Sequence, residues 1–426
     1  MKPILLGCIA DDFTGATDVA NNLVRTGMRS VQTIGVPVQP LDDEADAVIV
    51  ALKSRTAPVH EAIAQSIDAL RWLQAQGARQ IYFKYCSTFD SSAEGNIGPV
   101  TEALLDALSP AGDPGFTIAT PAFPDNQRTV FKGHLFVGDV LLHESGMQNH
   151  PLTPMTDSNL VRVLQAQCRR HVGLIDYRVV GAGVGAVRAR IAELRDQRVG
   201  IAIVDAISNA DLRTIGAAVS NLPLVTAGSG VAIGLPINFG LAPSNAASSL
   251  PSVSGARAIV SGSCSTATNL QVRAFIDTGG QAFRIDPTHI ASGADVAAEA
   301  LAWATSRLQA GPVLVYSTAD RASVAEVQQA LGIREAGEIV EAVLATIARR
   351  LVDQGVRRLI VAGGETAGAC VRSLGITHLK IGPQIDPGVP WCYARDGANG
   401  VALHLALKSG NFGADDFFTR AFAQPC

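Results

Sequence analysis

The sequence predicts an α/β protein of two α/β domains, whose mostly parallel sheets face each other across a cleft. Its 426 residues exceed what one hydrophobic core usually serves, so two domains are expected. Short apolar runs typical of strands alternate with helical patterns along the chain, which indicates βαβ units. Strands are predicted at residues 47–51, 80–84, 116–120, 177–180, 199–205, 256–261, 313–317 and 358–362.

A stretch of small, polar and proline residues without periodicity separates the two halves. It runs from residue 238 to residue 255 and is typical of a linker. The domains are therefore placed at residues 1–240 and 256–426. The second half begins as the first does, with a short apolar strand, a turn of small residues and a helix from Thr266. Because domain interfaces often hold small-molecule sites, we expect a ligand between the domains.

The composition argues against several classes of protein. Hydrophobic residues make up 47% and charged residues 17% of the chain, unlike a disordered protein. The net charge of −4 gives no reason to expect nucleic acid or an anionic membrane as partner. The apolar run before Asp11 is too short for a signal peptide, and no other run reaches the length of a membrane span. Seven cysteines without a C-x-x-C pair indicate reduced thiols in the cytoplasm.

The first predicted strand ends on two adjacent carboxylates. Residues 4–10 run directly into Asp11 and Asp12, and a threonine-glycine turn leads to a helix expected to open at residues 17–20. In an open α/β sheet the ligand crevice lies at the carboxyl ends of the strands. One of the two carboxylates could therefore orient or deprotonate a hydroxyl. The alternative is that either residue only caps the helix, because Asp is a favoured N-cap residue.

Cationic, hydroxyl and carboxylate side chains follow two further strands of the first half. Arginine can bind a carboxylate through two parallel hydrogen bonds, while hydroxyls and carboxylates suit a polyhydroxylated ligand. The pattern therefore predicts a site for a small polyhydroxy acid. The predicted substrate-binding residues beside Asp11 are Arg55, Lys84, Ser87, Thr88 and Asp90.

These residues divide the work in the predicted site. Arg55 and Lys84 would hold the carboxylate of the acid, while Asp12 and Asp90 would accept hydrogen bonds from its hydroxyls. The alternative is purely structural: Arg55 and Asp90 could form an ion pair, and Lys84 could be a solvated strand end.

A long segment with little periodicity follows the strand at 116–120. Long loops in a compact domain are often functional, so residues 121–129 and 134–157 are of interest. Arg128, His134 and His143 are candidates there, although a lone loop histidine is more often exposed or capping.

The second half carries glycine turns between strands and helices. Backbone N–H groups at a helix N-terminus attract phosphate, and glycine lets the ligand come close. Glu365 or Thr366 could reach Mg²⁺ or a hydroxyl, and the loop at 408–413 could close over a nucleotide. The alternative is that these turns need glycine for their shape alone. The predicted nucleotide-binding residues are Ser261, Ser263, Gly363, Gly364, Glu365, Thr366 and Gly410.

Other nucleotide-binding patterns are absent or weak. The chain contains no P-loop and no pair of protein-kinase motifs. Residues 181–186 fit G-x-G-x-x-A after a predicted strand, and Asp205 falls where a ribose-binding acid would stand. An NAD-dependent dehydrogenase is therefore the alternative, but such a fingerprint usually opens its sheet, and here several strands precede it.

With these motifs in view, the chain resembles the four-carbon acid sugar kinases, most closely those that act on 3-oxo-tetronates. The resemblance covers nearly the whole length. It rests on IADDFTGATD at 9–18, KYCSTFDS at 84–91, PAFPDNQRT at 121–129, SGSCS at 261–265 and GGETAG at 363–368. It implies an N-terminal sugar-acid-binding domain and a C-terminal nucleotide-binding domain.

The resemblance also implies a reaction. ATP would phosphorylate the 4-hydroxyl of a 3-oxo-tetronate, with Asp12 as the catalytic residue at that hydroxyl. Mg²⁺ is expected from this chemistry and not from any ligand spacing, so no metal ligand is predicted. A threonate or erythronate 4-kinase is the nearest alternative, and a non-catalytic sugar-acid-binding protein is a more distant one. A homo-oligomer stays open.

Overall fold

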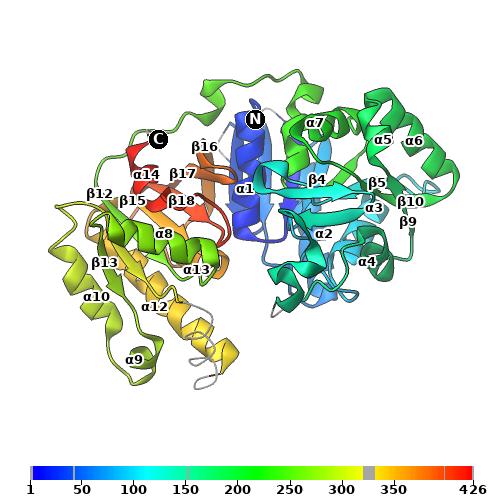
Figure 1. Cartoon of the computed structure of the whole chain (residues 1–426). Helices are drawn as coiled ribbons and strands as arrows, with labels where there is room; N and C mark the ends of the chain where they lie inside the picture. The colour runs from blue at the N-terminus through cyan, green and yellow to red at the C-terminus, as the bar shows by residue number, and fades with distance from the viewer. Residues whose placement is uncertain (1–2, 42–43, 151–152, 320–331, 398, 425–426) are drawn as a thin grey trace. The chain divides into compact units, whose positions relative to one another are not determined.

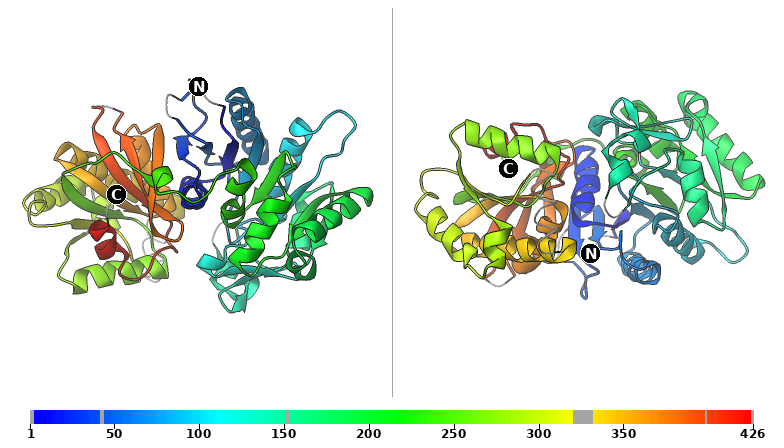
Figure 2. Two further views of the ribbon diagram at one scale, coloured as in Figure 1. Left: turned by 90° about the horizontal axis from the view of Figure 1, so that it is seen from above. Right: turned by 60° about the horizontal axis from the view of Figure 1, so that its bottom comes forward.

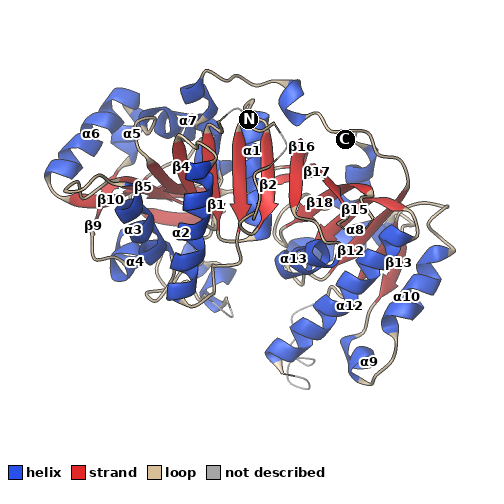
Figure 3. Ribbon diagram, turned by 180° about the vertical axis from the view of Figure 1, so that it is seen from behind, coloured by secondary structure: helices blue, strands red, loops and turns tan. Residues whose placement is uncertain are grey.

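The computed structural model describes residues 3–41, 44–150, 153–319, 332–397 and 399–424. The chain divides into two compact units, Met1–Ser248 and Ser249–Cys426 (Figure 1). Helices alternate with most of the parallel strands, whereas β16, β17 and β18 follow one another directly (Figure 3). The α/β class, the two domains and the mostly parallel sheets predicted from the sequence are confirmed. The cleft between the domains stays a prediction.

The first unit is built on a parallel sheet with strand order β2-β3-β1-β4-β11-β5-β10-β9. The inner strands β1, β3 and β4 are buried along their whole length, which explains their nearly continuous apolar sequences. The strands are β1 Leu6–Ala10, β2 Ser30–Ile34, β3 Ala47–Ala51, β4 Gln80–Lys84, β5 Thr117–Thr120, β9 His171–Ile175, β10 Val199–Val204 and β11 Leu224–Ala227.

Helices cover both faces of this sheet (Figure 2). Helix α3 packs against both α2 and α4. Helices α1 and α7 both pack against a short 3₁₀ helix, η4 Gly230–Gly234. A small antiparallel sheet of β6 Arg128–Phe131, β7 His134–Val137 and β8 Val140–Leu141 lies within the segment predicted as a long loop, of which residues 151–152 lie outside the described residues. The helices are α1 Phe13–Arg25, α2 Val59–Ala75, α3 Ile97–Leu108, α4 Leu160–Gln167, α5 Tyr177–Gly181, α6 Val184–Asp196 and α7 Asn209–Ala218.

The second unit has a mixed sheet with strand order β13-β14-β12-β15-β18-β17-β16. Its strands are parallel from β13 to β18, and β17 and β16 are antiparallel. The bounds are β12 Ala256–Ser261, β13 Gln281–Arg284, β14 Val313–Tyr316, β15 Val356–Ala362, β16 His378–Asp386, β17 Val389–Arg395 and β18 Ala402–Lys408.

An aromatic cluster forms part of the core of the second unit. Trp391 is fully buried with Phe275 and Phe417, and the guanidinium of Arg358 lies 4.7 Å from the centre of the Trp391 ring. No helix in the described part of the chain combines the length and hydrophobicity that a bilayer crossing needs. The helices of this unit are α8 Thr266–Asp277, α9 Pro287–Ala291, α10 Val296–Thr305, α12 Ile333–Asp353, α13 Gly364–Ser373 and α14 Phe417–Arg420.

Two local predictions are wrong. Residues 177–180 form helix α5 and not a strand, because the Asp176 carboxylate accepts hydrogen bonds from the N–H groups of Arg178 and Val179 and so caps a helix. The strand that precedes it is β9, at the edge of the sheet. Helix α1 begins at Phe13, well before residues 17–20, because Asp12 itself is the N-cap.

Candidate active site

The parallel strands of the first unit end in register along one edge of the sheet. In the order β3, β1, β4, β11 and β5, each final residue is paired with the final residue of the next strand. Side chains that follow these strands therefore project from one edge, where open α/β sheets bind their ligands. The final residues are Ala51, Ala10, Lys84, Ala227 and Thr120.

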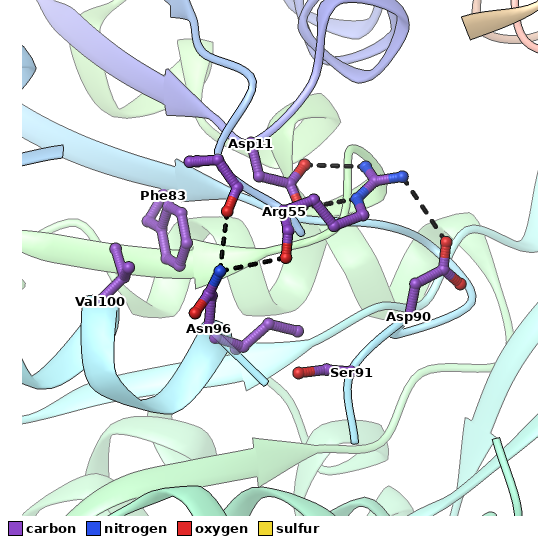
Figure 4. Close-up of a pocket in the computed structure, with 9 residues that line it drawn as sticks. Asp11, Arg55, Phe83, Asp90, Ser91, Asn96 and Val100 are labelled. Atoms are coloured by element: carbon purple, nitrogen blue, oxygen red, sulfur yellow. Dashed lines mark hydrogen bonds and ion pairs between the residues drawn. The ribbon is translucent and has the colours of Figure 1, made fainter. Parts of the chain in front are cut away.

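Arg55 lies in the loop after β3 and contacts three carboxylates. Its Nε and Nη2 donate to the two oxygens of Asp11 at 2.9 and 2.8 Å. Nη2 also lies 2.9 Å from Asp12 Oδ1. Nη1 lies 3.6 Å from Asp90 Oδ2, and Figure 4 draws the contacts of Arg55 with Asp11 and Asp90. The backbone N–H groups of Ser54 and Arg55 donate to the carbonyl of Asp11, which fixes the loop. The structure therefore contains the ion pair between Arg55 and Asp90 that was the structural alternative to substrate binding.

Asp12 both caps helix α1 and faces two cations. Its carboxylate accepts hydrogen bonds from the Gly15 N–H and the Thr14 hydroxyl, each at 3.0 Å. Lys84 Nζ lies 3.8 Å from Asp12 Oδ1. Burial favours protonation, but Arg55 and Lys84 outweigh it and lower the pKa of the Asp12 carboxyl. Asp12 is therefore ionised, fixed in place and available as a hydrogen-bond acceptor.

Unlike Asp12, two further carboxyls of the first unit have a raised pKa. Burial raises the pKa of Asp11, although the bidentate contact with Arg55 opposes the shift. Asp18, on the second turn of α1, is 2% exposed, and burial raises its pKa to about 7. Asp18 therefore titrates near neutral pH, a property that the sequence did not reveal.

A strained turn carries the remaining predicted residues. Phe89 is fully buried and has φ of 56°, a left-handed conformation that is unusual for a bulky residue. Its ring packs edge-on against Tyr85 at 5.5 Å, which anchors the turn. Thr88 donates to Asp90 at 2.5 Å, and Ser87 is buried beside them. The hydrophobic anchor thus holds the polar side chains of this turn in one arrangement.

The cavity beneath Arg55 is too small for a sugar acid. Its volume is about 10 Å³, room for roughly one water molecule. Asn96 lies at its wall and donates to the backbone carbonyls of Ser54, Arg55 and Ala57 at 2.8 to 3.1 Å. Asn96 therefore fixes the loop that carries Arg55.

The second unit repeats the arrangement of strand ends. Tyr316, Ser261, Ala362 and Lys408 are successive partners at the ends of β14, β12, β15 and β18. Helix α8 begins behind the N-cap Ser265, and α13 begins behind Gly363. Two helix N-termini therefore follow strands that end in register, which is an arrangement suited to phosphate groups.

The glycines of these turns are required by close contacts. A Cβ atom on Gly410 would lie 2.5 Å from Ser263 Oγ, and one on Gly363 would lie 3.2 Å from the Ser263 backbone N. Gly363 also has φ of 120°. The structure thus brings Ser263, Gly363 and Gly410 together.

The other nucleotide-site candidates differ in exposure. Gly364 and Glu365 are exposed in the first turn of α13, and Thr366 is buried. Ser261 is buried, and its hydroxyl bonds to that of Thr318 at 2.7 Å.

Lys408 is a residue that the sequence analysis did not assign. It is completely buried, and its Nζ donates to the Thr268 hydroxyl at 2.9 Å and to the carbonyls of Ser409, Gly410 and Phe412 at 3.0 to 3.2 Å. Burial lowers the pKa of Lys408 to about 7. The sequence feature that could have pointed to Lys408 is a lysine at the end of an apolar strand, the position that Lys84 has in β4. Through these hydrogen bonds Lys408 fixes the loop that contains Gly410.

The dinucleotide alternative is wrong on two counts. The element before residues 181–186 is helix α5 and not a strand. The Asp205 carboxylate accepts from the backbone N–H groups of Lys132, Gly133 and Tyr177 at 2.7 to 2.9 Å, so it serves the fold. His134 likewise bonds to the carbonyl of Lys132.

Two family models match the chain. A sugar-binding N-terminal domain matches residues 6–235, and a nucleotide-binding C-terminal domain matches residues 258–418. A Pseudomonas fluorescens protein named 3-oxo-tetronate kinase is 57% identical over 99% of this chain and 97% of its own length. A Burkholderia multivorans protein of the same name is 59% identical over 98% of this chain and 96% of its own length.

Solved structures of two relatives have the same fold. A Salmonella typhimurium LT2 protein matches with a TM-score of 0.86 and 44% identity, over 98% of both chains. A Haemophilus influenzae protein matches with a TM-score of 0.78 and 44% identity, over 98% of this chain and 99% of its own. Sequence, domain content and fold agree over nearly the full length, and the chain therefore belongs to the 3-oxo-tetronate kinase family.

Proposed function

We propose that the protein transfers the γ-phosphoryl group of ATP to the 4-hydroxyl of a 3-oxo-tetronate, giving 3-oxo-tetronate 4-phosphate and ADP. The observation that carries this proposal is the near-full-length identity of up to 59% with proteins named for that activity. The two sets of aligned strand ends support it, because one suits a polar acid and the other suits phosphates.

The first domain would bind and orient the sugar acid. Asp12 is ionised and held by its contacts to Gly15 and Lys84, so it accepts a hydrogen bond from the reacting hydroxyl and takes its proton as the bond to phosphorus forms. A carboxylate of low pKa is a weak base. Phosphoryl transfer tolerates this because positioning and charge stabilisation supply most of the catalysis.

The predicted contacts of the substrate's carboxylate need refinement. Arg55 shares its guanidinium with three carboxylates, so binding a fourth would require an exchange of partners. Lys84 is less engaged, with one carboxylate at 3.8 Å. We therefore propose that Arg55 mainly positions Asp11, Asp12 and Asp90, and that Lys84 faces the substrate.

The second domain would bind ATP. The N–H groups at the starts of α8 and α13 would hold its phosphates, with Ser263, Gly363 and Gly410 leaving room for them. Among the described residues, no three His, Cys, Asp or Glu side chains form a metal cluster. Mg²⁺ usually binds through phosphates, waters and one or two carboxylates, so it would enter with ATP, and Glu365 or Thr366 stays the predicted contact.

We also propose that the enzyme works in the cytoplasm. Cys8, Cys86, Cys168, Cys370 and Cys392 are free thiols, which is typical of proteins in a reducing compartment.

An ADP-release assay with a panel of acids tests the function. ATP and Mg²⁺ would be offered with 3-oxo-tetronate, threonate, erythronate or no acid, and ³¹P NMR would locate the new phosphate ester. We expect the highest kcat/KM with 3-oxo-tetronate and phosphorylation at the 4-hydroxyl. A higher kcat/KM with threonate or erythronate would favour the alternative substrate, and no ADP with any acid would refute the kinase.

A further inference from the structure

Arg128 follows the fifth of the aligned strand ends and is held in a fixed position. It begins β6, eight residues after β5 ends at Thr120. Its backbone pairs with Phe123 through two hydrogen bonds of 2.8 and 3.1 Å. The preceding residue, Gln127, has φ of 58°, a left-handed conformation that is uncommon outside glycine. The loop therefore presents Arg128 in one backbone arrangement.

Arg128 is half-buried, and its guanidinium has few partners among the described residues. No carboxylate of the described residues lies within 4.0 Å of its guanidinium, whereas Arg55 faces three. Its Nε is buried without a hydrogen-bond partner, and Nη1 donates to the carbonyl of Asn126. Because a buried donor without a partner is unfavourable, the Nε of Arg128 needs an explanation.

Another polar atom near these strand ends is also buried without a partner. It is Asn126 Nδ2, while the buried side chains of Asp18 and Ser229 interact with each other. Ser229 follows β11, the strand beside β5, and its carbonyl accepts from Asn22 of α1, the helix that also carries Asp18. Burial lowers the pKa of Arg128, and the nearby Asp90 and Asp18 oppose this shift. Unsatisfied buried donors are expected where a polar ligand binds.

We propose that Arg128 binds the carboxylate of the sugar acid. This inference rests on the proposed function, which supplies an anionic substrate. An acid that approached Arg55 would meet three carboxylates, but at Arg128 it would meet an unpaired guanidinium with a free Nε. Arginine can bind a carboxylate through two parallel hydrogen bonds, which would satisfy this donor and fix the acid's orientation.

The test compares each acid with its uncharged amide. Isothermal titration calorimetry without ATP would measure binding of 3-oxo-tetronate, threonate, erythronate and their carboxamides. The variants are Arg128→Met, Arg128→Lys and the control Arg71→Met, which changes an exposed arginine on α2. We expect the wild-type protein and Arg71→Met to prefer the acid by roughly 10²-fold, Arg128→Met to lose most of this preference and Arg128→Lys to keep part of it.

The outcomes separate this inference from the proposed function. An unchanged acid preference in Arg128→Met would overturn the inference, and so would a loss of kcat alone, which would place the guanidinium at the transferred phosphoryl group. A wild-type protein that binds none of the acids would overturn both proposals. Acid binding with the expected preferences but without ADP release would support Arg128 and refute only the kinase.

Thermal unfolding separates a binding role from a structural one. Since the guanidinium is unpaired, Arg128→Met should leave Tm unchanged or raise it. A marked fall in Tm would show that Arg128 supports the loop through Asn126. In that case Arg128→Lys decides, because a folded lysine variant without any acid preference over the amide would overturn the inference.

Discussion

Replacing Gly15 by alanine should remove most of the activity and leave the fold intact. Gly15 lies in the first turn of α1, beside Asp12, which we place at the reacting hydroxyl, and Lys84, which we propose faces the substrate. A Cβ atom built there would lie 2.0 Å from Lys84 Nζ and 2.1 Å from Asp12 Oδ1. To reach an ordinary contact of 3.4 Å, the lysine nitrogen would have to move by about 1.4 Å. Misplacement of about 1 Å can lower the rate about 10²-fold, so we expect kcat/KM to fall by that factor.

Two opposing effects keep the stability of Gly15→Ala close to that of the wild type. Alanine in a helix is favoured over glycine by about 0.5–1 kcal/mol. Displacing Asp12 weakens the cap that it forms with the Gly15 N–H, which is worth about 1 kcal/mol. The two nearly cancel, so Tm should change by less than about 4 °C.

The matched control is Gly185→Ala, in the first turn of α6. No atom lies within 4 Å of a Cβ built on Gly185, so this change gains helix propensity without a clash. The ADP-release assay and thermal unfolding would be run on both variants. A folded Gly15→Ala enzyme with normal kcat/KM would show that the placement of Lys84 and Asp12 does not matter to the reaction.

Three further changes test other parts of the site. Asp12→Asn keeps an acceptor for the Gly15 N–H but loses the base, so kcat should fall about 10²- to 10⁴-fold, and Tm should also fall because Arg55 and Lys84 lose a paired charge; near-normal kcat would remove Asp12 from the mechanism. Asp18 has a pKa raised from 3.8 to about 7, so the folded protein keeps a proton that the unfolded chain releases. Wild-type stability should therefore fall between about pH 4 and 7, by at most about 1.4 kcal/mol per pH unit. Asp18→Asn should remove this dependence, and parallel Tm–pH curves would contradict the assignment. Lys408→Met leaves the carbonyls of Ser409, Gly410 and Phe412 without their donor, so KM for ATP should rise about tenfold or more while binding of the sugar acid persists; an unchanged KM would exclude this loop from the nucleotide site.

Local sequence pattern predicted several inner strands with the observed bounds but missed others, such as β11 and β18. The predicted strands at 47–51, 80–84 and 256–261 have the same bounds as β3, β4 and β12. The first two are buried on both faces, and such strands have nearly continuous apolar sequences. Strand β9 lies at the sheet edge, is mostly half-buried and was missed. The apolar residues that follow it were read as a strand, but the cap at Asp176 makes them a helix.

The sequence by itself determined the α/β class and the family, together with the polar residue types that follow each strand. These features depend on local pattern and on motif order, both of which can be read along the chain. That Asp11, Asp12, Lys84 and the glycine turns lie at strand ends also follows from local pattern, because each directly follows an apolar run. Their roles in binding and catalysis stay predictions.

Only the tertiary structure decided which of these residues meet. Arg55 contacts Asp11 across 44 positions of sequence, and Lys408 contacts Thr268 across 140. These pairs depend on the order and register of the strands, which bring distant strand ends to one edge of a sheet. The same packing satisfies Arg55 with three carboxylates and leaves Arg128 without one. A charge pattern cannot reveal this difference, because both arginines follow strands in the same way and only the folded surroundings show which cation is already neutralised.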